Sequence, residues 1–303
     1  MLKDLEAADE ICDQADRLLR AADAYGRFPT PVDDLVRVSQ LSESDDYVLD
    51  EALISKAPAY LRALLRSARH KIQGLIDRRA RVIQISPDID HEGKRRFIKL
   101  HKTTHQILPH QQDLLYADDH ETLSRSTNRL FEREANQGAA ELLFQRNLFA
   151  KDAADLQISV AAIWDLANRY GSSFHAAARR YAETHPAAVA VIVLKPTPSR
   201  QNPPTWQREE SMATPAWIRR FGRPAWPRWI DASACPFVAA LDFPQSRARI
   251  RDLAGTAVEV CTDTCKTPYH SFLLLWIPPS RRLPLLSQPR AVRLAGAGTA
   301  TRP

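Results

Sequence analysis

The chain lacks any apolar run long enough to cross a membrane. A spanning helix needs about 20 consecutive apolar residues, whereas the most apolar stretch, residues 272–277, stops at Pro278 and predicts a buried strand. The N-terminal segment is charged, with Lys3 and Asp4 near its start, which does not match the apolar core of a secretory signal. These absences predict a cytoplasmic protein without a membrane partner.

Cysteine is scarce as well, with four in 303 residues. So few thiols do not make a disulfide framework in a chain of this size, and we expect them to be reduced in the cytosol. Cys12 is expected to pack within an N-terminal helix. Cys261 and Cys265 are separated by three residues rather than two, so a second zinc site that also uses Cys235 is the less favoured alternative.

A concentrated basic block is also missing. The net charge is +6 and the pI is about 9.2, but the arginines are spread along the chain, as expected for solvated faces. Nucleic-acid contact is compatible with this charge and is not indicated by it. A hydrophobic content of 44% provides for a full core, and the length of the chain is sufficient for two domains.

Apolar periodicity predicts an α+β fold that is mainly helical. Helices are expected over residues 2–24, 32–36, 57–69, 93–108, 131–144, 158–170 and 173–181. Strands are expected in a hairpin within residues 71–86 and over 188–194. The acidic segment 42–46 and the polar segment 110–122 are expected to be loops.

Two histidines, His101 and His105, are spaced so that both imidazoles lie on one face of a helix. The segment 131–144 has a helical apolar stripe with small residues, which allow close packing on another helix, and it carries Glu132. Two histidines and one glutamate leave a fourth tetrahedral position open, which is typical of catalytic zinc. The alternative is that His101 and His105 are ordinary helix residues in a domain that only binds a partner.

A catalytic glutamate is absent from the position where an H-E-x-x-H peptidase has one, because Lys102 stands there. General acid–base catalysis contributes about 10²–10⁴-fold in rate, and a charged ammonium cannot accept the proton. A divalent cation and burial both favour the neutral amine, which would let Lys102 act as a base; alternatively, Lys102 extends to solvent. Four other carboxylates are near enough in sequence to replace it: Glu134, Asp118, Asp119 and Glu121.

These segments together resemble the ImmA/IrrE family of zinc metallo-endopeptidase-like proteins. The family pattern R-F-x-x-x-H-E-x-x-H matches Arg96 to His105 except at Lys102, and E-x-x-A-N-x-x-A-A-x-L-L matches Glu132 to Leu143. The hairpin segment also fits, and the match covers roughly residues 60–195.

The resemblance implies a zincin-like domain with a short β-hairpin or sheet, in which His101, His105 and Glu132 bind zinc and Lys102 takes the position of the base. Family members are bacterial or phage-related, usually cytosolic, and several cleave a transcriptional repressor that is often encoded beside them. The resemblance therefore implies a regulatory endopeptidase with a protein partner. The alternative is a pseudo-peptidase that regulates by binding a protein or DNA.

Residues 158–181 have the spacing of a helix-turn-helix, with a turn at Gly171 and Ser173 as the N-cap of the second helix. The same pattern is similar to the accessory helices that follow the zinc segment in the family. A packing role is favoured because the second helix is rich in alanine and offers few donors to base edges. The alternative is DNA binding through Arg179 and Arg180.

The C-terminal part contains five of the six tryptophans, from Trp206 onward. These aromatics either fill the core of a small α+β domain or belong to a sensor or partner-binding module. The predicted organisation is N-terminal helices packing on the peptidase-like domain (1–56), a metallopeptidase-like core (57–147), an accessory helix-turn-helix-like segment with a strand (148–195), a linker (196–207), a small C-terminal domain (208–283) and a disordered tail (284–303).

Overall fold

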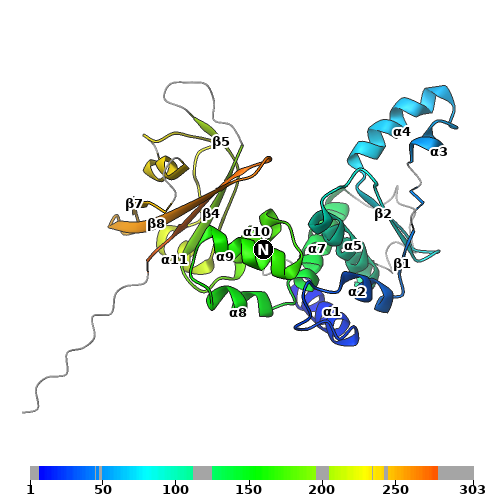
Figure 1. Cartoon of the computed structure of the whole chain (residues 1–303), viewed down its shortest axis with the longest axis horizontal. Coiled ribbons are helices and arrows are strands. Elements are labelled where there is room, and N and C mark those ends of the chain that lie inside the picture. Colours follow the sequence, from blue (N-terminus) through cyan, green and yellow to red (C-terminus); the bar gives the residue numbers. More distant parts are fainter. Residues whose placement is uncertain are drawn as a thin grey trace, which may run out of the picture.

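The computed structural model describes residues 7–44, 46–47, 50–111, 125–195, 205–233, 235–241 and 245–278. The α+β class is confirmed: helices form most of the N-terminal half and a six-stranded sheet forms the C-terminal half (Figure 1). Within the described ranges, every helix is too short or too polar to cross a lipid bilayer. The expected tail, most of the expected linker and the carboxylates Asp118, Asp119 and Glu121 lie outside the described residues.

The N-terminal half contains a small three-stranded sheet with helices around it. Its first elements are α1 (Ala8–Ala21), α2 (Val32–Val38), β1 (Ser42–Ser44), α3 (Glu51–Ile54), α4 (Ala59–Lys71), β2 (Gly74–Asp77) and β3 (Val82–Ile85). The hairpin of β2 and β3 is confirmed. The expectation of a loop at 42–46 is wrong for β1, which pairs in parallel with β3. Its polar sequence shows no strand pattern, and hydrogen bonds to its neighbour give it the strand conformation.

Two long helices, α5 (Glu92–Ile107) and α7 (Arg125–Leu143), pack against one another (Figure 1). The imidazole of His91 caps the start of α5 by accepting a hydrogen bond from the Lys94 amide at 3.3 Å. On α7 the small residues Ala135 and Ala139 are fully buried. Gly138 meets the side chain of Thr104 on α5, as expected for a segment of small residues that lets two helices approach closely.

Gly138→Ala is expected to lower the free energy of unfolding by about 1–3 kcal/mol, because a methyl group at this position overpacks the helix interface. The added carbon would lie 2.3 Å from Cγ2 of Thr104, and the Thr104 hydroxyl is fixed by donating to the Leu100 carbonyl at 2.8 Å. At an exposed helical site the same change would stabilise the helix by about 1 kcal/mol. Chemical denaturation measures the difference.

The matched control is the same change in a Thr104→Ala background, which removes the colliding carbon. Most of the lost stability should return in the double variant. Equal losses in both backgrounds would show that the contact between Gly138 and Thr104 does not set the distance between the two helices.

Two helices lie where the helix-turn-helix-like pair was expected, α9 (Val160–Tyr170) and α10 (Phe174–Thr184), and they follow α8 (Leu148–Ala154). Gly171 ends α9 with a positive φ of 68°, and the Ser173 hydroxyl accepts from the Ala176 amide at 3.2 Å. Helix α10 packs on the sheet and buries one face, which includes Phe174, Ala177, Ala178 and Tyr181. Arg180 is itself buried, so it does not offer its guanidinium to DNA.

The large sheet is antiparallel throughout, with strand order β6-β5-β4-β9-β8-β7. Its strands are β4 (Val189–Leu194), β5 (Trp206–Ala213), β6 (Trp229–Ile230), β7 (Arg247–Arg251), β8 (Ala257–Lys266) and β9 (Ser271–Trp276), with α11 (Pro215–Phe221) and the 3-10 helix η2 (Pro236–Leu241) between them. The predicted strand at 188–194 is thus an inner strand of this sheet, and β5 begins inside the predicted linker. The other domain boundaries stay a prediction.

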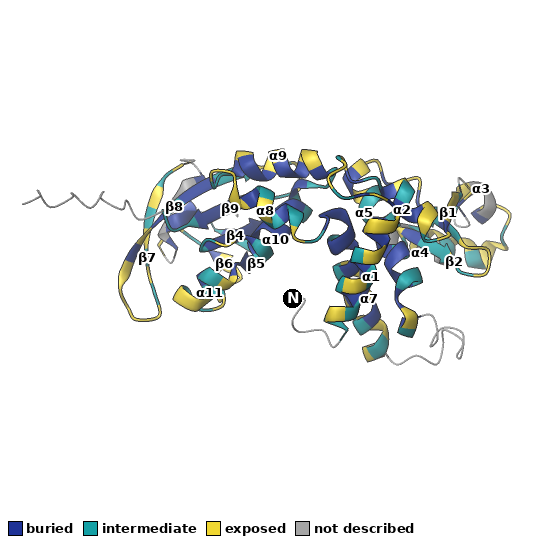
Figure 2. Ribbon diagram, turned by 90° about the horizontal axis from the view of Figure 1, so that it is seen from below, coloured by how far each residue is buried: buried dark blue, intermediate teal, exposed yellow. Residues whose placement is uncertain are grey.

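The two faces of the large sheet belong to two hydrophobic cores. Val191 and Leu274 face a core that is shared with the N-terminal helices, α9 and α10. Ile192 and Leu273 face a second core with Trp217. Figure 2 shows buried residues running through both halves of the molecule. Trp217 therefore fills a core, as one of the two interpretations of the tryptophans expects.

Candidate metal centre

The side chains of His101 and His105 leave α5 on the same face, one turn apart, as their spacing predicts. Both residues are buried, with 8% and 7% exposure. Their Nε2 atoms lie 3.1 Å apart, and their rings meet edge to face with centroids 4.8 Å apart. The two ring nitrogens therefore point at one small volume.

Glu132 on α7 completes this cluster from the second helix. One carboxylate oxygen lies 3.2 Å from Nε2 of His101, and the other lies 3.4 Å from Nε2 of His105. In a tetrahedral site with ligand bonds of about 2.0 Å, donor atoms are about 3.3 Å apart. The separations among these side chains match that value, so the three fit one ion of the size of zinc.

The opposite ring nitrogens are held by amide oxygens. Nδ1 of His101 lies 3.0 Å from Oδ1 of Asn136, and Nδ1 of His105 lies 2.7 Å from Oε1 of Gln111. An amide oxygen only accepts, so each Nδ1 carries the hydrogen and each Nε2 presents a lone pair to the cluster. Two lone pairs and a carboxylate facing one point are a donor set for a cation, with the outer hydrogen bonds typical of metal-binding histidines.

The electrostatics of the cluster favour the ligand forms of these groups. Burial lowers the pKa of His105, and the neighbouring His101 and Lys102 add to this effect against the opposing pull of Glu132 and Gln111. The two imidazoles, His101 first, hold the pKa of Glu132 far below its usual range. A neutral histidine and an ionised glutamate are the forms that bind a metal.

Glu134 does not face the metal cluster, although its sequence position made it a candidate base. It is buried at 2% exposure, and its Oε2 accepts from Nε2 of Gln111 at 2.7 Å and lies 2.8 Å from Nε2 of His110. Its helical position, two residues beyond Glu132, turns it to another side of α7. Glu134 instead supports Gln111, which in turn holds His105.

Lys102 is partly buried, so its side chain does not extend freely into solvent. Its Cε lies near β2, 3.8 Å from where a side chain at Gly74 would begin. Burial lowers the pKa of Lys102 and Arg78 lowers it further, while Glu132 raises it. The end of the Lys102 side chain therefore lies near β2, and Glu132 is close enough to influence its charge.

Three polar residues of the centre had no role in the sequence prediction: Asn136, Gln111 and His110. Asn136 follows Glu132 by one helical turn, so its approach to His101 could have been found from spacing. Gln111 and His110 follow Pro109 in a segment without apolar periodicity, and part of the expected loop is helical up to Gln111. The contacts of Gln111 and His110 depend on the position of α7 relative to this segment, which the sequence does not give.

The cysteines form no second cluster of metal ligands in the described part of the chain. Cys261 and Cys265 lie on β8, and four residues of strand span roughly 13 Å. One ion cannot bind both thiols. The sulfur of Cys265 instead accepts a hydrogen bond from the indole of Trp164 at 3.4 Å.

A zincin-like domain is the class that these features define: a helix with two histidines, a glutamate on the next helix and a small sheet beside them. Residues 63–181 match the model of the IrrE N-terminal-like domain, Peptidase_M78. The resemblance of this segment to ImmA/IrrE proteins is therefore confirmed.

Comparison with solved structures finds a Mycobacterium tuberculosis transcriptional regulator at 14% sequence identity and a TM-score of 0.48, with 88% of this chain and 75% of that chain covered. No curated protein matches the chain.

Proposed function

We propose that this protein is a zinc-dependent regulator of the IrrE-like kind that cleaves a protein partner such as a helix-turn-helix repressor. The observation that carries the proposal is the convergence of His101, His105 and Glu132, with ligand-atom separations that fit one ion. The match of residues 63–181 to the IrrE N-terminal-like model supports it. The identity of zinc, the three ligand roles and the cytoplasmic location remain part of this proposal.

A zinc ion in this site would act as a Lewis acid on a peptide carbonyl. The chain's own residues orient the site, because Asn136 and Gln111 fix the two imidazoles and Glu132 supplies the third donor. Lys102 takes the position of the family base. While the Lys102 amine is charged, it cannot accept a proton as the glutamate of the family would.

Lys102 is also the observation that favours a second function, regulation by association without cleavage. In this alternative the same fold binds its partner and the metal only stabilises the site. The N-terminal helices and sheet would then serve as a binding surface, and the loss of the family carboxylate would have no cost for function.

The discriminating experiment compares the parent chain with Lys102→Glu in a cleavage assay. The substrate to test is any helix-turn-helix repressor that a neighbouring gene encodes, with equimolar zinc present. If the first function holds, the parent cleaves, Glu132→Gln abolishes cleavage, and Lys102→Glu raises the rate by up to about 10²–10⁴-fold. If the second holds, the parent binds the repressor without cutting it, and only Lys102→Glu cuts.

Lys151→Glu is the matched control, since it makes the same charge change on an exposed site of α8. It should behave as the parent chain does. A parent that takes up no zinc in equilibrium dialysis would contradict the metal-dependent function, whatever the assay shows. If the parent chain neither binds nor cuts the repressor, the repressor is not its partner under either function.

A further inference from the structure

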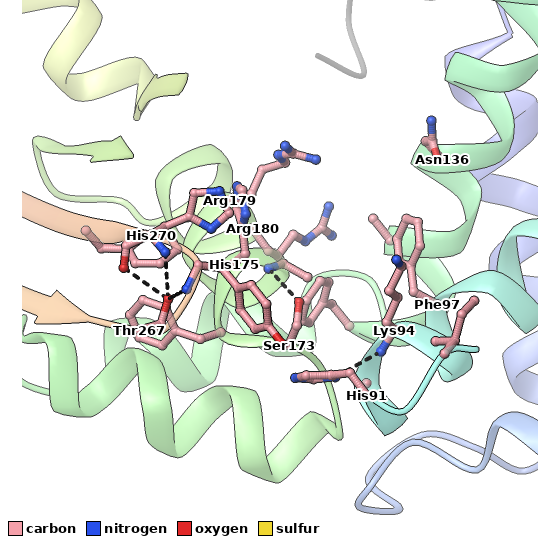
Figure 3. A pocket seen from close by; sticks show the side chains of 18 of the residues that line it. His91, Lys94, Phe97, Asn136, Ser173, His175, Arg179, Arg180, Thr267 and His270 are labelled. Carbon is pink, nitrogen blue, oxygen red and sulfur yellow. Dashed lines mark hydrogen bonds between the residues drawn. The ribbon is translucent and has the colours of Figure 1, made fainter. Parts of the chain in front are cut away.

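A cavity of about 1000 Å³ lies between the two halves of the molecule. Its walls come from α5 and α7, from α10, and from the turn between β8 and β9 (Figure 3). None of the three proposed metal ligands lines it. Ligand pockets commonly have volumes of about 300–1000 Å³, so this one has room for a small organic molecule.

Aromatic rings form much of the apolar wall. Trp164 and Phe174 lie with ring centroids 4.6 Å apart, and Phe174 meets Phe272 at 4.8 Å. Two aromatic residues that line the cavity remain open to solvent: Trp164 at 39% and Tyr269 at 72% exposure. Exposed rings beside a pocket are available to stack on a planar ligand.

The cationic side chains at this cavity come from both halves. Arg133 on α7 and Lys94 on α5 are exposed, and neither forms a salt bridge with another described residue. Arg179 on α10 also lines it and shares Glu210 with His175, at 2.7 and 2.9 Å. Arg133 and Lys94 therefore remain available to a bound anion.

The acidic side chains at the cavity oppose this charge only weakly. Asp88 is paired with Arg69 at 2.7 Å. Glu183 is partly buried, and burial raises its pKa. Asp90 is the remaining carboxylate among the described lining residues. The open part of the cavity therefore favours a negative ligand over a positive one.

We propose that this cavity between the two halves binds a small organic anion with a planar aromatic ring. The ring would stack against Tyr269 and Trp164, and the anionic group would accept from Arg133 and Lys94. Purine mononucleotides and aromatic carboxylates both have this chemistry. The proposal is independent of the metal-dependent function, because the residues it uses are not metal ligands.

One wall residue links this cavity to the metal centre. Asn136 lines the cavity and its Oδ1 holds Nδ1 of His101. A ligand that contacts Asn136 could therefore change the hydrogen bond that orients His101 without entering the metal site. Binding of a small molecule in the cavity would in this way be coupled to the metal centre through Asn136.

Isothermal titration of the full chain tests the site, with GMP as the nucleotide probe and indole-3-acetate as the carboxylate probe. At least one should bind with a dissociation constant below about 1 mM, and the tighter of the two identifies the source. Guanosine and inorganic phosphate, which carry the ring or the charge alone, should bind at least about tenfold more weakly than GMP if GMP is the ligand.

Arg133→Gln and Tyr269→Ala should each weaken binding by about tenfold. The first removes a contact to the anionic group, and the second removes the ring on which the ligand stacks. Both side chains are exposed, so the fold does not depend on them. Arg249→Gln, on the exposed face of β7, is the matched control and should leave binding unchanged. Failure of both probes to bind overturns the proposal, and so does binding that neither cavity variant weakens.

Discussion

Glu141→Ala is expected to lower the free energy of unfolding by about 3–5 kcal/mol, because it leaves a buried guanidinium without its partner. Arg180 on α10 donates from both terminal nitrogens to the Glu141 carboxylate on α7, at 2.8 and 2.9 Å. The two side chains are only 6% and 4% exposed. Burial by itself raises the pKa of Glu141, but the attraction of Arg180 and the hydrogen bonds outweigh burial and lower it, so the pair is ionised at neutral pH.

Two comparisons make this first prediction specific. Replacing both members, as Glu141→Leu with Arg180→Met, should recover much of the lost stability, because apolar residues of similar size leave no buried charge. Glu209→Ala removes a carboxylate that is 40% exposed and lies beside Lys195 and His270, and it should cost less than about 1 kcal/mol. Urea denaturation would contradict the prediction if Glu141→Ala and Glu209→Ala unfolded at the same midpoint.

Glu132→Gln is expected to reduce zinc affinity by more than about 100-fold, provided that the proposed site holds the metal. Loss of an outer hydrogen-bond partner of a metal ligand already costs about 10–100-fold, and Glu132 is the charged member of the donor set itself. An amide of the same shape keeps the packing of α7 and removes the charge. Competition with a chromophoric chelator measures the affinity.

Asn136→Ala is the internal comparison for this second prediction. It removes only the hydrogen bond to Nδ1 of His101, so its effect should fall within the range of about 10–100-fold, below that of Glu132→Gln. Thermal unfolding without metal should be similar for both variants, since both side chains are exposed. Equal zinc affinity in the parent and Glu132→Gln would remove Glu132 from the site.

Helical periodicity predicted part of the geometry of the candidate centre, and the family resemblance supplied Glu132 as the third ligand. Residues four apart share a helical face, which placed His101 with His105, and the small residues around Gly138 predicted the close second helix that carries Glu132. Gln111 could not be predicted, because its contact with His105 depends on the path of the chain after Pro109. The direction of Glu134 away from the cluster follows from its helical position two residues beyond Glu132, but its contacts with His110 and Gln111 could not be predicted.

Pairing between distant strands was the main feature of the fold that the sequence did not indicate. The apolar pattern of residues 188–194 predicts a buried strand but does not say which strands lie beside it. The sequence suggested that this strand precedes a linker, whereas β4 pairs with β5 on one side and β9 on the other. β1 was missed because its three polar residues gain their conformation from β3 alone.

The place of β4 in the sheet has a consequence for how the protein is made. All six of its residues are buried in the finished molecule, and one of its two partners is β9, which ends at Trp276. During synthesis, β4 therefore leaves the ribosome before its partner β9 exists. One edge of this apolar strand stays unpaired until more than a quarter of the chain has followed. Open apolar edges recruit other chains, so nascent copies depend on dilution or on a chaperone during that interval.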